Sequence, residues 1–396
     1  MRRLVRFARG RVNHLLLPGR ARAERERDNR RELAADAGAA KASEAALLWL
    51  FRAQDGSASS DGGVARHFSL IHGWARSYPE TTGYILSTLL ETRNTPHLTE
   101  CRERARRMGN WLLSIQFEEG AFPGGVVGEE PVVPVIFNTG QILLGLVSAA
   151  REFGEPYRNG AERAAAWLVA AQDPDGAWRK HMSPFAKPGV KVYDTHVAWA
   201  LLEAARLFDS AAHARAGLRN VEYALSRQRA NGFFDDNCLS DPEAPLTHTI
   251  GYALRGILEA YRYSRDGALL QAARRAADGI LVSLGPDGYL AGRLRPDWHP
   301  AVHWVCLTGS VQIAHCWLLL YAWTGDERYL DAGCAANAFV RRTLRFEDCD
   351  GVNGGVKGSF PVDGAYNPYM YLNWAAKFLI DSNRLELDIL AGQAPA

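Results

Sequence analysis

The sequence predicts an all-α protein, an (α/α)6 toroid in which six helical hairpins close into a ring behind a basic N-terminal helical extension. Three observations support this fold. A helical phrase that ends in Gln and an acidic-Gly turn recurs six times, a second and more apolar phrase follows each copy, and long loops alternate with short ones. Internal repeats of this period are typical of architectures that stack one supersecondary unit.

The first phrase supplies the outer helix of each hairpin. It reads "LLWLFRAQDG", "NWLLSIQFEEGAF", "AAWLVAAQDPDGAW" and "ALSRQRANGFF", with weaker copies in "ILVSLGPDGYL" and "FVRRTLRFEDCDG". The anchor positions are separated by 62, 56, 56, 56 and 62 residues, and they are Gln54, Gln116, Gln172, Gln228, Leu284 and Phe346. Glycines in the turns supply the left-handed conformation that ends a helix.

The second phrase supplies the inner helices. Segments such as "NTGQILLGLVSAA" and "DTHVAWALLEAA" are apolar almost all round, as expected of helices enclosed on both sides, whereas the outer helices keep one charged face. In chain order we expect six hairpins, which pair residues 41–54 with 78–91, 97–116 with 136–151, 158–172 with 192–207, 212–228 with 246–264, 266–284 with 305–323, and 327–344 with 366–381. The toroid would span residues 41–384 and leave a tail at 385–396.

The N-terminal extension, residues 1–40, differs in composition from the rest. Residues 1–22 hold seven Arg and no acidic residue, mixed with Leu, Val and Phe. Such a segment can lie as a basic amphipathic helix on an anionic lipid surface. The alternatives are a helix packed on the outside of the toroid or a basic arm without fixed structure.

Composition narrows the classes of partner. A net charge of +2 gives no case for nucleic-acid binding. Six Cys without a CxxC pair indicate a reducing compartment and no zinc site, and no other metal or cofactor is expected. No apolar run is long enough to span a membrane. We expect a cytoplasmic protein, at most peripheral at the inner membrane face through residues 1–22.

The "QDPDGAW" turn and its copies resemble the repeats of α/α toroid enzymes over about 340 residues. That superfamily includes six-hairpin glycosidases, toroid polysaccharide lyases and epimerases, and terpenoid cyclases with protein prenyltransferases. The chain also resembles bacterial proteins of polysaccharide-assembly gene clusters. The resemblance implies the barrel and leaves the reaction open.

The loops from outer to inner helices run about 14–20 residues, longer than most helix connections, so they gather at the face where the inner helices begin. Positive helix dipole ends there would favour an anionic substrate. Eight of the eleven His residues fall in this layer if His315 is counted. The stretch "HGWARSYPETTGY", residues 72–84, forms one sector of it.

These segments offer the groups of a sugar site, in which aromatic faces stack on pyranose rings and polar side chains bond hydroxyls. Arg76, Lys180 and Lys357 could hold a carboxylate or phosphate. The candidate substrate-binding residues are His72, Trp74, Arg76, Tyr78, Tyr84, Asn138, Gln141, Trp298, His303, Tyr366, Asn367 and Tyr371.

The leading reaction is β-elimination or C5 epimerisation of a uronate in an acidic oligo- or polysaccharide. It needs a group that neutralises the carboxylate, a base for the C5 proton and an acid. Asn138 or Arg76 could neutralise, His196 or His248 could be the base, and Tyr252 the acid.

Three alternatives stay open. A glycoside hydrolase would need two carboxylates, for which the candidates are Glu80, Asp194 and Asp363, followed by Asp235 and Asp236. A terpenoid cyclase would want an apolar cavity, and a non-catalytic glycan-binding toroid would keep only the aromatic residues. Glu80 and Asp194 could also have purely structural roles. Glu80 follows Pro79 in a first helical turn, and Asp194 stands where a helix cap is expected.

Overall fold

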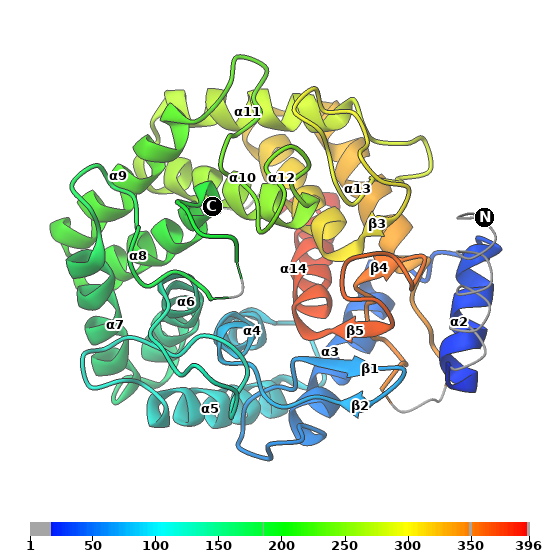
Figure 1. The fold of residues 1–396 in the computed structure, drawn as a ribbon, viewed down its shortest axis with the longest axis horizontal. Helices are drawn as coiled ribbons and strands as arrows, with labels where there is room; N and C mark the ends of the chain where they lie inside the picture. The colour runs from blue at the N-terminus through cyan, green and yellow to red at the C-terminus, as the bar shows by residue number, and fades with distance from the viewer. Residues whose placement is uncertain (1–16, 185, 348–350, 394–396) are drawn as a thin grey trace, which may run out of the picture.

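The computed structural model describes residues 17–184, 186–347 and 351–393, and in them two concentric rings of six helices form the (α/α)6 toroid (Figure 1). The outer helices are α3 (Ala39–Asp55), α5 (Leu98–Ser114), α7 (Tyr157–Ala171), α9 (Ala211–Ser226), α11 (Gly267–Leu281) and α13 (Glu327–Arg341). The inner helices are α4 (Pro79–Glu91), α6 (Ile136–Phe153), α8 (Thr195–Phe208), α10 (Thr247–Ser264), α12 (Leu307–Thr324) and α14 (Asn373–Leu390). The predicted fold class is confirmed.

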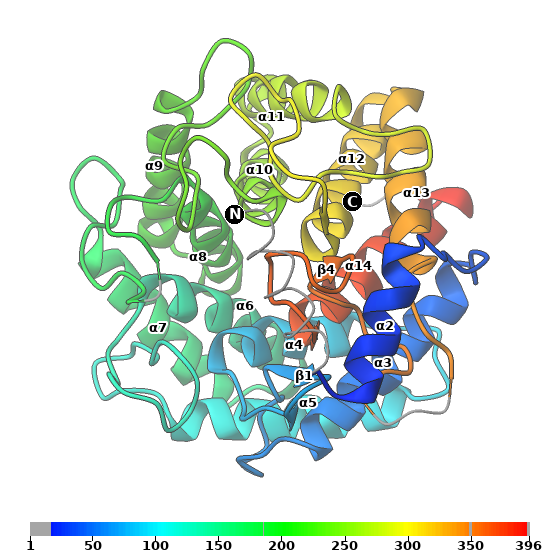
Figure 2. The same cartoon turned by 45° about the vertical axis from the view of Figure 1, so that its right-hand side comes forward.

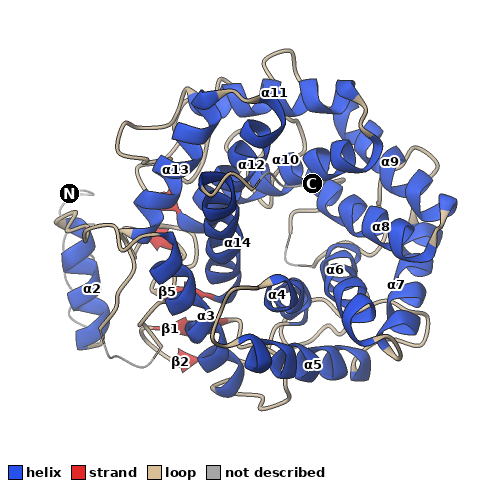
Figure 3. Cartoon of the chain, turned by 180° about the vertical axis from the view of Figure 1, so that it is seen from behind, coloured by secondary structure: helices blue, strands red, loops and turns tan. Residues whose placement is uncertain are grey.

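The inner helices are apolar all round because they are enclosed by the outer ring on one side and by one another on the other. In α12 every residue from 307 to 320 is buried. Each inner helix packs on the next, and α14 packs against both α3 and α4, which closes the ring (Figure 3).

The repeated Gln explains the 56-residue period, because its side chain ties neighbouring hairpins together. The amide nitrogen of Gln172 donates to the Gly176 carbonyl at 3.0 Å, in its own turn, and to the Ala216 carbonyl at 2.9 Å, on the next outer helix. Its amide oxygen accepts from Arg219. The same three bonds recur 56 residues earlier at Gln116 and 56 residues later at Gln228.

The turn glycine that follows each Gln is needed for two reasons. Gly176 has φ +90°, and a Cβ there would lie 2.3 Å from the carbonyl oxygen of Arg219. Gly120 and Gly232 repeat both features against Arg163 and Arg275. The turn can therefore contact the next outer helix only when this position has no side chain.

Short strands join loops at the start and the end of the ring. Strands β1 (His67–Ser69), β2 (Gly73–Trp74) and β5 (Met370–Leu372) form an antiparallel sheet in the order β2-β1-β5, with Phe68 paired to both Trp74 and Tyr371. Strands β3 (Val305–Cys306) and β4 (Ser359–Phe360) also pair. The sheet thus links the first and sixth loops and reinforces the ring closure.

The extension contributes one described helix, α2 (Gly19–Asn29), which lies outside the ring (Figure 2). Its Glu24 and Asp28 carboxylates bind the ammonium of the buried Lys357 at 2.7 and 2.6 Å. The structure therefore supports a helix packed on the toroid for residues 19–29. Most of the proposed lipid contact, residues 1–16, lies outside the described residues. None of the helices in the described part of the chain is long and apolar enough to cross a membrane.

The two ends of the last inner helix differ most from the prediction. The last inner helix begins at Asn373 instead of 366, because Asn367 and Tyr369 have φ of +49° and +59°. It continues to Leu390, past the expected end of the toroid at 384, because Glu386 is buried in an ion pair with Arg341. The short strands were not predicted, since two or three residues carry no detectable alternation.

We expect Gly176→Ala to lower the free energy of unfolding by about 3 kcal/mol, because it combines backbone strain with a clash against α9. Gly325→Ala is the matched control: Gly325 is left-handed with φ +69°, but no atom lies within 4 Å of a Cβ there. It should cost only about 1 kcal/mol. Urea unfolding measures both, and equal losses would contradict the contact between turn and helix.

Candidate active site

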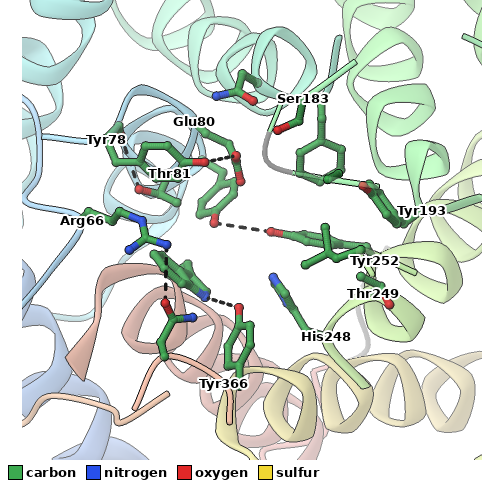
Figure 4. A pocket seen from close by; sticks show the side chains of 17 residues that line it. Arg66, Tyr78, Glu80, Thr81, Ser183, Tyr193, His248, Thr249, Tyr252 and Tyr366 are labelled. Atoms are coloured by element: carbon green, nitrogen blue, oxygen red, sulfur yellow. Dashed lines mark hydrogen bonds between the residues drawn. The ribbon is translucent and has the colours of Figure 1, made fainter. Parts of the chain in front are cut away.

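A cavity of about 230 Å³ opens at the end of the barrel where the inner helices begin (Figure 4). Its walls come from the first turns of the inner helices and from the long loops that precede them. The lining residues are Arg66, Tyr78, Glu80, Thr81, Tyr84, Phe137, Asn138, Ser183, Ala186, Tyr193, Leu239, His248, Thr249, Tyr252, Tyr366, Asn367 and Trp374. The expectation that the mouth of the barrel collects polar and aromatic side chains is confirmed.

Glu80 is the one carboxylate in this lining. It lies in the first turn of α4, directly after Pro79, and its Oε2 accepts a 2.8 Å hydrogen bond from the Tyr78 hydroxyl. Burial raises the pKa of Glu80 to about 7, despite opposing effects of the Tyr78 hydrogen bond and the Arg66 charge. A carboxyl group with this pKa exchanges a proton readily at neutral pH.

His248 lies on the opposite side of the cavity, on α10, three positions from α4 around the six-helix inner ring (Figure 4). Its Nδ1 is 2.7 Å from the side-chain oxygen of Gln312. An amide oxygen only accepts, so Nδ1 carries the proton and Nε2 keeps its lone pair. Burial lowers the pKa of His248 to about 4, which keeps the ring neutral at physiological pH.

Two phenols meet between these walls. The hydroxyls of Tyr84, on α4, and Tyr252, on α10, are 3.5 Å apart. The Tyr252 ring also lies 4.5 Å from the His248 ring, between centroids. Burial raises the pKa of both tyrosines well above 10, so both remain protonated and can donate hydrogen bonds.

Arg66 is the cation of the cavity, and it was not anticipated from the sequence. Its guanidinium lies 5.2 Å from the Trp374 ring and 5.7 Å from the Tyr78 ring, and it contacts Asn367 at 3.5 Å. Within the described residues its side chain bonds the His67 ring and Asn367 and forms no ion pair with a carboxylate. Its position directly before His67, at the start of strand β1, is the sequence feature that could have indicated it.

Eight of the expected site residues line the cavity. They are Glu80, His248 and Tyr252 from the expected catalytic set, and Tyr78, Tyr84, Asn138, Tyr366 and Asn367 from the expected binding set. Trp374, from the same end of α14, bonds the Tyr366 hydroxyl at 3.0 Å. Tyr193 and Trp374 stood in the sequence segments singled out above without being chosen.

His196 and Gln141 lie just behind the lining. The His196 Nδ1 is 2.7 Å from the Gln141 side-chain oxygen, and the imidazole ring is 4.6 Å from that of Tyr252. Both residues are buried, and the His196 Nε2 has no hydrogen-bond partner among the described residues. Burial holds the pKa of His196 well below 6.5. This pair supports the Tyr252 ring from behind.

The structure does not bring the other expected residues to the cavity. Asp194 is buried beyond Tyr193; burial raises its pKa to about 8, and its side chain makes no cap bond to α8. His72, Arg76 and His303 are exposed. Trp74 packs on Trp49 and Phe68, Trp298 packs on Phe233 and bonds the Asn231 carbonyl, and Tyr371 is fully buried.

Lys357, expected as an anion-binding group, is instead the buried partner of α2. His315, counted with the mouth, lies on the far half of α12 and lines a different cavity. Across the described residues, no three His, Cys, Asp or Glu side chains are grouped as metal ligands.

Comparisons with known proteins found one matching family model and several structures with a similar fold. A family model, the squalene-hopene cyclase C-terminal domain, matches residues 79–258. No curated protein sequence matches the chain. The unsaturated glucuronyl hydrolase of Bacillus sp. GL1 has a similar structure, with a TM-score of 0.68 and 17% identity over 90% of this chain and 98% of that one.

Two further structures are similar over the same extent. The cellobiose 2-epimerase of Bacillus thermoamylovorans has a TM-score of 0.67 and 12% identity, over 91% of this chain and 98% of that one. A D-mannose isomerase has a TM-score of 0.70 and 12% identity, over 89% and 97%. The expected resemblance to α/α toroid enzymes is confirmed at the level of the fold.

The raised pKa of Glu80 predicts how its replacement changes stability with pH. A carboxyl that holds its proton more tightly in the folded state loses stability as pH rises from about 4.5 to about 7. We therefore expect Glu80→Gln to gain up to about 3 kcal/mol relative to the wild type between pH 4.5 and pH 8.

Urea unfolding at pH 4.5 and pH 8 measures this gain. Glu119→Gln, in an exposed turn, controls for the loss of one negative charge. If the difference between Glu80→Gln and the wild type were the same at both pH values, Glu80 would not carry a raised pKa.

Proposed function

We propose that the protein is a carbohydrate-active enzyme that moves the C5 proton of a uronate residue in an acidic oligo- or polysaccharide, by epimerisation or β-elimination. One observation carries the proposal. Glu80 and His248 face each other across one cavity, and their pKa values are displaced in opposite directions, so a protonated acid and a neutral base coexist near pH 7.

The first step would be shared by both reactions. Arg66, which has no carboxylate partner among the described residues, would bind the uronate carboxylate and stabilise the negative charge that develops when C5 loses its proton. The His248 Nε2 would accept that proton. The hydrogen bond from Nδ1 to Gln312 keeps the ring in the orientation and tautomer that this requires.

The second step separates the two outcomes. In epimerisation, protonated Glu80 returns a proton to C5 from the opposite face, which inverts the centre. In β-elimination, the C4–O bond breaks, a C4–C5 double bond forms, and Glu80 or Tyr252 protonates the departing oxygen. Placement of acid and base on opposite walls favours epimerisation, because inversion needs a proton acceptor on one face of C5 and a proton donor on the other.

The alternatives fit the cavity less well. Hydrolysis by paired carboxylates needs two acids flanking one bond, and Glu80 stands alone in the described lining. A cyclase cavity for a carbocation would be apolar, whereas this one also carries the ionisable groups of Arg66, Glu80 and His248. A glycan-binding protein without catalysis would have no need of an acid and a base on opposite walls of the cavity.

The similar folds support a sugar substrate, because the structures named above are those of a glucuronyl hydrolase, an epimerase and an isomerase. We also propose that the enzyme works in the cytoplasm, with residues 1–22 as a contact to an anionic membrane surface.

We expect Glu80→Gln and His248→Gln each to reduce kcat at least about 100-fold on the correct acidic oligosaccharide, because each removes one proton-transfer group. His299→Ala, an exposed histidine outside the cavity, is the matched control and should keep wild-type turnover. Epimerised products are followed by NMR, and cleaved products by mass spectrometry in heavy-oxygen water. Products that gain labelled water would mean hydrolysis and would overturn the proposal.

Arg66→Gln should raise KM at least about 10-fold for a uronate oligosaccharide but not for its carboxyl-reduced counterpart, because only the former presents a carboxylate. Steady-state kinetics on the matched pair of substrates measures this. An equal increase in KM for both substrates would show that Arg66 does not bind the carboxylate.

A further inference from the structure

A second cavity, also about 230 Å³, lies at the opposite end of the barrel, near the C-terminal ends of the inner helices. It is lined by Ser87, Glu91, Leu144, Val147, Ser148, Arg151, Trp199, Glu203, Arg255, Arg262, His315, Lys377, Asp381 and Arg384. All six inner helices contribute to it. The proposed reaction uses none of these residues.

Charged side chains dominate this cavity. Its lining residues belong to an ion-pair network with six cations, Arg151, Arg206, Arg255, Arg262, Lys377 and Arg384, and four carboxylates, Glu91, Glu203, Glu259 and Asp381. Within that network, two positive charges have no matching negative charge. The negative helix dipole ends stabilise some of these cations, and the backbone carbonyls of Glu203 and Arg262 accept hydrogen bonds from Arg151 and Arg206.

Unused hydrogen-bonding groups in the same lining indicate a ligand. Trp199 Nε1, Arg384 Nη1 and His315 Nδ1 are buried atoms without a hydrogen-bond partner among the described residues. The first two can only donate, and His315 is itself 8% exposed. Buried donors without acceptors are costly, and an acceptor-rich anion would satisfy them.

A layer of aromatic side chains separates the two cavities. Tyr84 and Tyr252 line the first cavity, and the Phe378 ring packs against both, at 5.4 and 5.9 Å. The Lys377 ammonium, which lines the second cavity, lies 5.1 Å from the Tyr84 ring. A ligand in the second cavity would therefore contact the layer beneath the candidate active site without entering it.

We propose that this second cavity is a binding site for a small oxyanion, recognised through a phosphate or carboxylate group. Arg384 and Trp199 donate hydrogen bonds to it, and the excess positive charge of the surrounding network stabilises it. Its volume is far above the roughly 10–15 Å³ that one water needs.

Isothermal titration calorimetry of the full chain with inorganic phosphate, and separately with succinate, tests the proposal at ionic strength held constant with chloride. We expect one of the two anions to bind. Arg384→Gln and Arg151→Gln, on different helices, should each weaken that binding at least about 10-fold. Arg384→Lys should retain part of it, because the charge remains. Thermal melts show whether each variant folds.

Two controls locate the site. Arg219→Gln, on the outer helix α9, removes one positive charge elsewhere, and Arg66→Gln alters the candidate active site. Both should bind the anion as the wild type does. The proposal is overturned if neither anion binds the wild type, if Arg219→Gln weakens binding as much as Arg384→Gln, or if Arg66→Gln alone abolishes it. None of these outcomes depends on the proposed reaction.

Discussion

The structure depends on contact between neighbouring hairpins, because a single hairpin cannot bury its apolar faces. The Gln side chain makes this contact by donating hydrogen bonds to a carbonyl of its own turn and to a carbonyl of the next outer helix. The turn glycine allows the turn to lie close to that helix. Repetition at a 56-residue interval places successive hairpins with the same orientation. As a result, all inner helices begin at one end of the barrel, and residues near the starts of α4, α6, α10 and α14 line a common cavity.

Catalytic geometry follows from that symmetry. Because α4 and α10 stand opposite each other in the inner ring, Glu80 and His248 approach from two sides although 168 positions separate them in the chain. The same enclosure shields both groups from most of the solvent and moves their pKa values in opposite directions. Closure of the ring by α14 and the β1–β5 pairing brings Arg66, Asn367 and Trp374 beside them.

The repeat allowed the fold to be predicted from the sequence, because the Gln anchors, the turn glycines and the apolar inner helices all result from the packing of one hairpin on the next. It also identified the layer that holds Glu80, His248 and Tyr252. It could not separate cavity residues from their neighbours in that layer. Trp298 and Tyr371 are of the same residue types as the lining residues but are buried in the protein interior. Lys357 forms its ion pairs with α2, which is distant in the sequence. Arg66 gave no helical signal, because short strand pairing positions it.

Solvent hydrogen exchange at the sugar carbon tests the central claim most directly. The enzyme would be incubated with a uronate oligosaccharide in deuterium oxide, and the recovered substrate and product examined by NMR. Proton transfer between opposite walls predicts deuterium at C5 of the product epimer, with uptake reduced at least about 100-fold in His248→Gln. Turnover that leaves the C5 proton in place would contradict the account.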